Sequence, residues 1–414
     1  MKIHYRHFKS LIAAGCAVAC LLIGTAASAH SLERIGNVFY IYMENHNWTQ
    51  PNGNVNTDPS SGIEQIKGNP AAPFINSLID PNSPMSVQVS YTNNCYNVLA
   101  TPSGMNPDIH PSEPNYIWQE GGSNFGIFND ADPYVGGNVF DLPNISGLLQ
   151  NAGLSWKSYQ EDIDLVPNSG TVNHPGPNSL TSVVAPGDQW TVPLSSFSGR
   201  SASYTNPYNG STQYNFAPKH DGQLFFTTTN GGTTTTPDPT TSNPEVPHYL
   251  PLQALASDLA NNSVAKFNVI TPDQFNDMHS GLTGGFTYNG VHYTGDAALI
   301  AQGDNFLRTV VPMIMASPAY NHNSMIVIWT DETEESGNDT TRDDFNHSLM
   351  EIIISPLAKG HAYHNDSITY THSSDVITLQ EAFPIGPKQG HPFLGQTTMD
   401  AAGNHDYSDM FNNG

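Results

Sequence analysis

Basic side chains are scarce in this sequence. Its 414 residues include 13 Lys and Arg against 37 Asp and Glu, which gives a formal net charge of −24 at pH 7. A protein that binds nucleic acid needs a basic surface to contact phosphates, so we expect no nucleic-acid binding. Charged residues of both signs make up only 12% of the chain, which is about half the usual share.

Cysteine is nearly absent as well. The sequence has three cysteines, of which Cys16 and Cys20 lie in an N-terminal segment that we expect to be removed. Cys95 would then have no partner for an intramolecular disulfide. Stability must therefore come from a buried core, for which the chain is long enough. This excludes the small folds that disulfides hold together.

Long apolar runs are missing apart from one near the N-terminus. Residues 11–23 are mostly apolar, three Lys or Arg residues precede them, and the small residues 27–29 follow. This layout is typical of a secretory signal peptide over residues 1–29, and we predict cleavage after Ala29. The run is shorter than the roughly 20 residues that span a bilayer, so we expect export to the periplasm or beyond without a stable membrane anchor.

Four shorter apolar runs predict buried β-strands. They are residues 35–43, 266–270, 325–329 and 350–354. Nearly continuous runs of apolar, β-branched and aromatic residues are typical of strands that are covered on both faces in a parallel sheet. Apolar residues recur at helical spacing in three further stretches, at 145–149, 252–259 and 299–314. The alternation of strands and helices predicts an α/β fold.

Glycine and proline are plentiful, with 35 and 31 residues. Together with Asn, Ser and Thr they dominate two stretches, at about 168–214 and 227–247. We interpret these stretches as long loop insertions, or a small cap, within a single domain over residues 30–414. Predicted strands that end in acidic residues lie on both sides of them, so they are not interdomain linkers.

Oxygen-bearing side chains directly follow two of the predicted strands. Glu44 and Asn45 follow the first, and Asp331 and Glu332 follow the third. In open α/β sheets, ligands bind outside the carboxyl ends of the strands, so these residues are candidates for one shared site. Carboxylate and amide oxygens are ligands that suit a divalent cation. The alternative is that they are ordinary solvated residues at strand ends.

Ser112 lies in a stretch that is restricted by two prolines, Pro111 and Pro114, just before a predicted helix at 116–120. Backbone N–H groups at a helix N-terminus would face an anion beside this hydroxyl, which is the arrangement that a phosphoryl nucleophile needs. The alternative role for Ser112 is that of a helix N-cap.

Three histidines, His220, His279 and His347, lie near the acidic strand ends or in predicted loops. An imidazole can bind a phosphoryl oxygen or transfer a proton near neutral pH. A lone histidine is nevertheless more often a surface or hydrogen-bonded residue, and we interpret His372 in this way.

Taken together, these residues resemble a known family. The matching pieces follow one another in the family's order across nearly the whole predicted mature chain. They are Met43-Glu44-Asn45-His46, His110-Pro111-Ser112-Glu113-Pro114-Asn115-Tyr116, Ser155-Trp156-Lys157-Ser158-Tyr159, Lys219-His220, Asn276-Asp277-Met278-His279, Trp329-Thr330-Asp331-Glu332 and His347. In this set the sequence is similar to the secreted bacterial phosphoesterases of the acid phosphatase and phospholipase C type, within the alkaline-phosphatase-like superfamily.

The resemblance implies a three-layer α/β/α sandwich with a mostly parallel central sheet. It also implies one divalent metal ion, whose ligands would be Glu44, Asn45, Asp331 and Glu332. Ser112 would be the nucleophile and would also face the metal. His220 and His279 would bind the phosphoryl oxygens of the substrate.

The resemblance leaves two details open. Asp277 and His347 could complete a second metal position, as in two-metal relatives, although four oxygen donors suffice for one ion. The sequence also departs from the family pattern, because Asp221-Gly222-Gln223 stands where Asn-Pro-Phe is usual and Ser280 stands where Asp is frequent. Substrate contacts at these two positions are therefore open.

The function expected from the residues and the resemblance is that of an exported, metal-dependent acid phosphatase. It would hydrolyse small phosphate monoesters through a phosphoserine intermediate. The alternatives are a phospholipase C or another phosphodiesterase, and a catalytically silent secreted binding protein. Protonated His220 and His279 would hold a phosphoryl dianion best, so we expect a pH optimum of roughly 5 to 6.5.

Overall fold

The structure is a computed structural model of the whole chain, and it describes the larger part of the sequence. The described residues are 32–50, 62–97, 99–101, 104–106, 109–131, 133, 137–163, 205–206, 208–211, 215–234, 242–334, 347–395, 397 and 404–412. The predicted signal peptide, residues 1–29, lies outside the described residues. So does most of the predicted insertion at 168–214.

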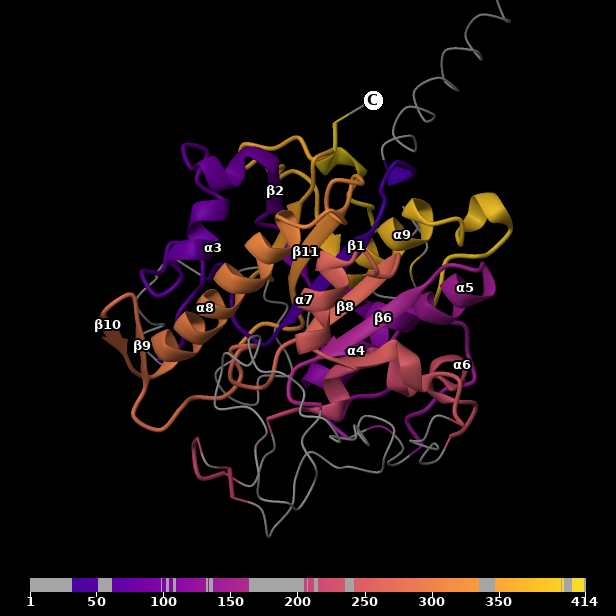
Figure 1. Cartoon of the computed structure of the whole chain (residues 1–414), viewed down its shortest axis with the longest axis horizontal. Helices are drawn as coiled ribbons and strands as arrows, with labels where there is room; N and C mark the ends of the chain where they lie inside the picture. Colours follow the sequence, from indigo (N-terminus) through magenta and orange to yellow (C-terminus); the bar gives the residue numbers. More distant parts are fainter. Residues whose placement is uncertain are drawn as a thin grey trace, which may run out of the picture.

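A seven-stranded sheet forms the centre of the molecule (Figure 1). Its strands are β1 (Val38–Met43), β2 (Val89–Thr92), β6 (Trp156–Gln160), β7 (Tyr249–Pro251), β8 (Phe267–Thr271), β11 (Met325–Thr330) and β12 (Glu351–Ile354). They lie in the order β2-β12-β11-β1-β8-β6-β7. Neighbouring strands from β11 to β7 are parallel, whereas β12 is antiparallel to both β11 and β2. The four predicted strands are confirmed, and the sheet is mostly parallel.

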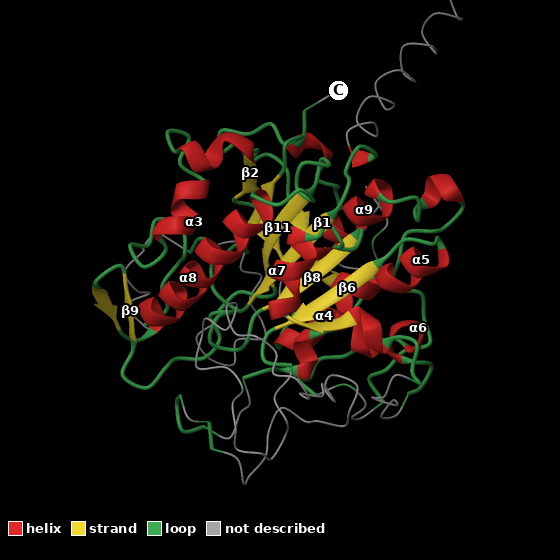
Figure 2. Cartoon of the chain, viewed as in Figure 1, coloured by secondary structure: helices red, strands yellow, loops and turns green. Residues whose placement is uncertain are grey.

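Helices cover both faces of this sheet (Figure 2). They are α3 (Pro73–Leu78), α4 (Ser112–Gly121), α5 (Ile145–Asn151), α6 (Thr227–Asn230), α7 (Gln253–Ala260), α8 (Asp296–Met315) and α9 (His372–Ala382). The predicted helices at 145–149, 252–259 and 299–314 correspond to α5, α7 and α8. None of the described helices combines the length and the apolar composition that crossing a bilayer requires.

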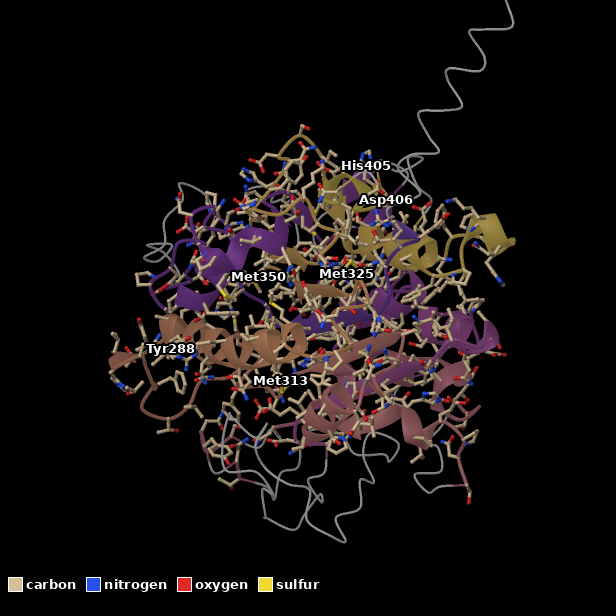
Figure 3. All side chains as sticks on the ribbon, turned by 45° about the horizontal axis from the view of Figure 1, so that its top comes forward. Tyr288, Met313, Met325, Met350, His405 and Asp406 are labelled. Atoms are coloured by element: carbon tan, nitrogen blue, oxygen red, sulfur yellow. The ribbon has the colours of Figure 1, made fainter. Side chains whose placement is uncertain are left out.

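The two faces of the sheet belong to two separate apolar cores. Side chains of β1 alternate between them: Tyr40 and Tyr42 pack with residues of α4, α5 and α9, whereas Phe39 and Ile41 pack with residues of α3, α7 and α8. Figure 3 labels one member of each core, Met325 and Met350. Because a strand's side chains point alternately to opposite faces, this packing confirms the expected three-layer α/β/α sandwich.

Three small strand pairs accompany the central sheet. They are β3 (Cys95–Tyr96) with β13 (Tyr370–Thr371), β4 (Leu99–Thr101) with β5 (Gly104–Asn106), and β9 (Phe286–Tyr288) with β10 (Val291–Tyr293). The thiol of Cys95 is fully buried in this arrangement. Within the predicted insertion at 227–247, Thr229 and Asn230 of α6 are buried as well.

Two buried carboxyl groups, Glu351 of β12 and Asp375 of α9, lie close to each other. Burial raises the pKa of Asp375 to about 7. Burial and the nearby Asp375 raise the pKa of Glu351 well above its ordinary value. In the unfolded chain both groups titrate near pH 4. Their protonation therefore stabilises the fold below about pH 4, and this contribution is lost as the pH rises to 7 and beyond.

We therefore expect Glu351→Gln to stabilise the protein at pH 8 and to have little effect at pH 4.5, because glutamine keeps the shape of the protonated acid without its charge. The expected gain at pH 8 is on the order of 1–3 kcal/mol in the free energy of unfolding. Urea unfolding at the two pH values measures it. Glu33→Gln, which removes a surface ion pair with Lys388, serves as the control and should change little. Equal effects of Glu351→Gln at both pH values would contradict the raised pKa of Glu351 in the folded state.

Candidate active site

The carboxyl ends of two adjacent parallel strands bring the predicted metal ligands together. In the register of β1 and β11, Met43 is paired with Thr330. Glu44 and Asp331 are the residues that follow these two strands. The backbone N–H of Asp331 donates to the carbonyl oxygen of Met43, over 3.2 Å. The carboxyl groups of Glu44, Asp331 and Glu332 are all buried here. The interpretation as solvated strand-end acids is therefore wrong.

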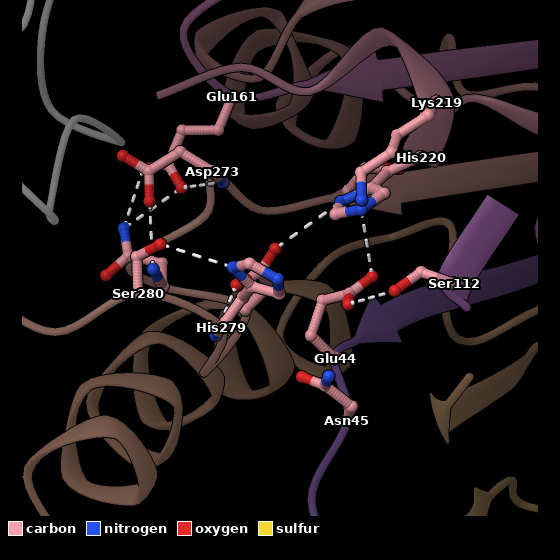
Figure 4. Close-up of polar contacts among 12 residues, drawn as sticks. Glu44, Asn45, Ser112, Glu161, Lys219, His220, Asp273, His279 and Ser280 are labelled. Carbon is pink, nitrogen blue, oxygen red and sulfur yellow. Dashed lines mark hydrogen bonds and ion pairs between the residues drawn. The ribbon is translucent and has the colours of Figure 1, made fainter. Parts of the chain in front are cut away.

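Ser112 lies between two of these carboxyl groups. Its Oγ is 2.9 Å from Glu44 Oε2 (Figure 4). It also lies 3.2 Å from Glu332 Oε1, and the side chain is buried. Ser112 is the first residue of α4, and the preceding Pro111 occupies the N-cap position. The alternative role of Ser112 as the N-cap is therefore wrong. Its hydroxyl instead lies at the positive end of the α4 dipole, which favours anions.

The charges of this cluster fit a bound divalent cation. Burial raises the pKa of Glu44 to about 7, and the neighbouring Glu332 adds to this increase. Burial, Glu44 and Glu332 also raise the pKa of Asp331 well above its ordinary value. Neither side-chain oxygen of Asp331 makes a hydrogen bond of ordinary length within the described part of the chain. A cation would offset the repulsion and would give these oxygens a partner.

Two neighbours hold Glu332. Asn45 Nδ2 lies 3.5 Å from Glu332 Oε1, so in this orientation the amide faces the carboxylate as a donor. On the other side, His110 Nδ1 is 2.7 Å from Glu332 Oε2. The sequence placed His110 in a family motif but assigned it no role. Its position immediately before Pro111 was the only signal for it.

His220 is buried between two carboxyl groups. Its Nε2 lies 3.1 Å from Glu44 Oε1 and its Nδ1 lies 3.6 Å from Asp277 Oδ2 (Figure 4). The imidazole stacks on the ring of Tyr116, whose hydroxyl donates to Glu44 Oε1 over 2.5 Å. Burial lowers the pKa of His220 well below its ordinary value, and Lys219 and His279 lower it further. The direction of this shift favours a neutral imidazole at His220 over the expected imidazolium.

Asp277 belongs, with Glu44 and His220, to a group that has metal-ligand spacing. Ligand atoms of Glu44, His220 and Asp277 all lie within 4.8 Å of one another. The backbone carbonyl of Asp277 also accepts the N–H of Glu44, over 2.8 Å. The expected second-metal pair was Asp277 with His347. The structure instead places Asp277 in a group with Glu44 and His220, and His347 is a buried residue outside that group.

His279 lies beside His220 but is less deeply buried. The two ring centroids are 6.3 Å apart, and His279 is partly exposed to solvent. Its backbone N–H donates to Asp277 Oδ1 over 2.8 Å, and its Nδ1 lies 3.2 Å from the hydroxyl of Ser280. Ser280 therefore replaces the aspartate that is frequent in the family with a neutral partner for this imidazole.

Lys219 supplies a positive charge to the cluster. Its side chain is almost completely buried and forms an ion pair with Asp130. It acts against the increase in the pKa of Glu44, so it lies close enough to offset part of the negative charge. In the sequence, Lys219 stands only as part of the Lys-His motif, which indicates no function for it.

The residues that depart from the family pattern after His220 pack against α4 and β6. Gln223 Nε2 donates to Glu120 Oε1 over 2.8 Å, and Asp221 Oδ1 accepts the hydroxyl of Ser158 over 3.3 Å. Gly222 packs so closely that a Cβ there would lie 2.5 Å from the backbone oxygen of Tyr116. This segment therefore has a structural role in holding the helix that carries Ser112.

His372 links Trp329 to the backbone of Asp331. Its Nδ1 accepts the indole N–H of Trp329 over 3.0 Å, which leaves the proton on Nε2. Nε2 then donates to the backbone oxygen of Asp331 over 2.5 Å. Burial lowers the pKa of His372 to about 4. Its interpretation as a structural residue is confirmed.

One family model and two known proteins are similar to this chain. The family model described as the Phosphoesterase family matches residues 44–386. A phosphatidylinositol-3-phosphatase from Mycobacterium tuberculosis is 34% identical over 101 residues, which are 24% of this chain and 27% of that protein. The chain thus spans about a quarter of the length of this relative. A solved protein of the alkaline phosphatase superfamily from Vibrio parahaemolyticus has a TM-score of 0.45 at 8% identity, over 93% of this chain and 78% of the other.

Proposed function

Since the chain belongs to the phosphoesterase family, we propose that it is an exported, metal-dependent acid phosphatase that uses Ser112 as its nucleophile. One observation carries this proposal. The Ser112 hydroxyl is buried at a helix N-terminus, within hydrogen-bond distance of Glu44 and Glu332. A serine in this position has a proton acceptor beside it and a site for an anion in front of it.

The chain's own residues account for most of the reaction. Ser112 Oγ attacks the phosphorus atom while its proton passes to Glu44 or Glu332. The bond between phosphorus and the leaving oxygen breaks, and the same carboxyl returns the proton to that oxygen, so the alcohol of the substrate leaves. Water then attacks the phosphoserine, one of its protons passes to Ser112 Oγ as the serine–phosphate bond breaks, and inorganic phosphate is released. A divalent cation held by Glu44, Asp331 and Glu332 would lower the pKa of the serine hydroxyl and offset charge on a phosphoryl oxygen.

His220 and His279 take different roles in this proposal. Both ring nitrogens of His220 face carboxyl groups, so this residue positions Glu44 and Asp277. His279 is nearer to solvent and neighbours His220. We assign the contact with the phosphoryl oxygens to His279, assisted by the charge of Lys219.

The lipid-directed alternatives are distinguished by their substrates. The Mycobacterium tuberculosis relative is named for a phosphate monoester on a lipid headgroup, which makes a phosphoinositide monoester a second candidate substrate. A phospholipase C would instead cleave a phosphodiester.

The purified protein should be assayed with p-nitrophenyl phosphate, bis(p-nitrophenyl) phosphate, phosphatidylcholine and phosphatidylinositol 3-phosphate, with chelator and after metal is restored. A lack of turnover on all four substrates with metal present would favour the silent binding protein.

We expect the highest kcat/KM on p-nitrophenyl phosphate at roughly pH 5 to 6.5. The physical basis is electrostatic, because the strongly acidic chain repels an anionic substrate less in acid. The fold tolerates this range, since burial raises the pKa values of Glu120 and Asp375 to about 7 and both groups are protonated in the folded state at pH 5. Their contribution to stability is lost as the pH rises through 7.

A pH profile of kcat/KM tests this expectation, with a stability profile over the same range as its control. A maximum above about pH 8 would contradict the acid phosphatase assignment. It would instead favour a second cation at Glu44, His220 and Asp277, because a cation there replaces protons as the partner of these groups.

A further inference from the structure

A second polar cluster lies next to the candidate active site and takes no part in the proposed reaction. It consists of His46, two residues after Glu44, Glu334, two residues after Glu332, and Asp296, the first residue of α8. His46 Nε2 is 3.1 Å from Asp296 Oδ1 and 3.5 Å from Glu334 Oε2. All three ligand atoms lie within 4.8 Å of one another.

These distances match the spacing of ligands around a small metal ion. Nitrogen and oxygen ligands at 2.0–2.2 Å from a tetrahedral zinc ion are about 3.3–3.5 Å apart. A hydrogen bond accounts less well for the cluster, because one proton on His46 Nε2 cannot serve two carboxylates fully. Glu334 Oε2 is buried, and its polar neighbours among the described residues are His46 Nε2, 3.5 Å away, and the carboxyl group of Asp296; it makes no hydrogen bond of ordinary geometry.

The ligand atoms are held in place by their own surroundings. The second oxygen of Asp296 accepts the backbone N–H of Glu64 over 2.6 Å. The side chain of Asn47 binds the main chain of Glu334 at both its N–H and its carbonyl, over 3.0 and 3.2 Å. Outer contacts of this kind orient ligands in known metal sites. The side chains of His46, Asp296 and Glu334 are 2%, 10% and 28% exposed, so an ion could enter past Glu334.

We propose that His46, Asp296 and Glu334 bind a divalent transition-metal cation, for which Zn²⁺ is the best match, separately from the Ser112 cluster. One imidazole and two carboxylates suit zinc, whereas calcium prefers six to eight oxygen ligands. The two carboxylates also balance the charge of the ion. Bound there, the ion ties the loops that follow β1 and β11 to the start of α8. This fixes Glu44 and Glu332, each two residues before a ligand.

Zinc stoichiometry tests the site without any measurement of catalysis. The full chain is stripped with chelator, reloaded with Zn²⁺, freed of excess metal and analysed by mass spectrometry. Glu334→Gln should bind about one equivalent less than the wild type. Asp331→Asn should lose a different equivalent, so the double variant should lose both. His292→Gln, an exposed histidine of β10, is the matched control and should bind as much zinc as the wild type.

Thermal unfolding gives an independent measurement. Zinc should raise the Tm of the Asp331→Asn protein, because the second site is intact, and should no longer do so in the Asp331→Asn/Glu334→Gln protein. Circular dichroism confirms that each variant is folded, and Asp296→Asn replaces Glu334→Gln if the latter is not. The proposal is overturned if folded Glu334→Gln and Asp296→Asn proteins bind as much zinc as the wild type. The cluster would then be an imidazolium shared by two carboxylates.

Discussion

Replacing Ser112 by alanine should remove nearly all turnover and leave the fold intact. Loss of a nucleophilic hydroxyl should lower kcat by at least about a thousandfold. The stability of the protein should change by no more than about 1 kcal/mol, since only hydrogen bonds to Glu44 and Glu332 are lost. Turnover of p-nitrophenyl phosphate and the far-UV spectrum measure the two effects.

The control for this variant is Ser77→Ala in α3, which deletes a hydroxyl that donates to the carbonyl of Phe74. It should leave kcat unchanged. A second measurement separates nucleophile from positioning residue: brief acid quenching should trap phosphate covalently on the wild type, and the trapped phosphopeptide should contain Ser112. Wild-type turnover in Ser112→Ala, or a phosphopeptide from elsewhere in the chain, would contradict the nucleophile assignment.

Replacing Asp331 by asparagine should abolish tight metal binding at the Ser112 cluster and lower kcat by about a hundredfold or more. The carboxylate has no hydrogen bond of ordinary length within the described residues, so its charge is available for a cation. In the absence of metal, Asp331→Asn should raise the free energy of unfolding, whereas in the presence of metal it should lower it. Burial, Glu44 and Glu332 raise the pKa of Asp331, so ionising it destabilises the metal-free fold as the pH rises.

Asp331→Asn should therefore stabilise the metal-free protein at pH 8 and destabilise the protein in the presence of metal. Urea unfolding, once with chelator and once with added divalent cation, measures the change in the free energy of unfolding under both conditions. Asp366→Asn, at an exposed position paired with His364, is the control and should change neither. The same destabilisation with and without metal would show that Asp331 is only a structural residue.

The sequence alone determined the strands and the ends at which the site lies. Runs such as 325–329 are apolar on both faces, and only a strand covered on both sides by helices buries such a run completely. Glu44 follows one of these runs directly and Asp331 follows another after one residue, and the carboxyl ends of parallel strands meet at one edge of a sheet. Both residues could therefore be assigned to one site before any contact was known.

Only the tertiary structure decided which groups surround these residues and what charge they carry. The pKa of His220 depends on its burial and on Lys219 and His279, and burial cannot be read from a loop sequence. His110 and Lys219 contribute to the site because α4 and the segment after 215 fold against β1 and β11. Neither residue has a pattern of its own.

The cluster of His46, Asp296 and Glu334 likewise depends on the tertiary structure and not on local sequence. Asp296 is 250 residues from His46 along the chain, and no spacing rule relates positions so far apart. Their contact exists because β1 and β11 are neighbours in the sheet and α8 begins beside their ends. Local sequence specifies a strand or a helix through the pattern of its apolar residues. The pairing of strands and the packing of helices bring distant polar side chains within a few ångströms of one another.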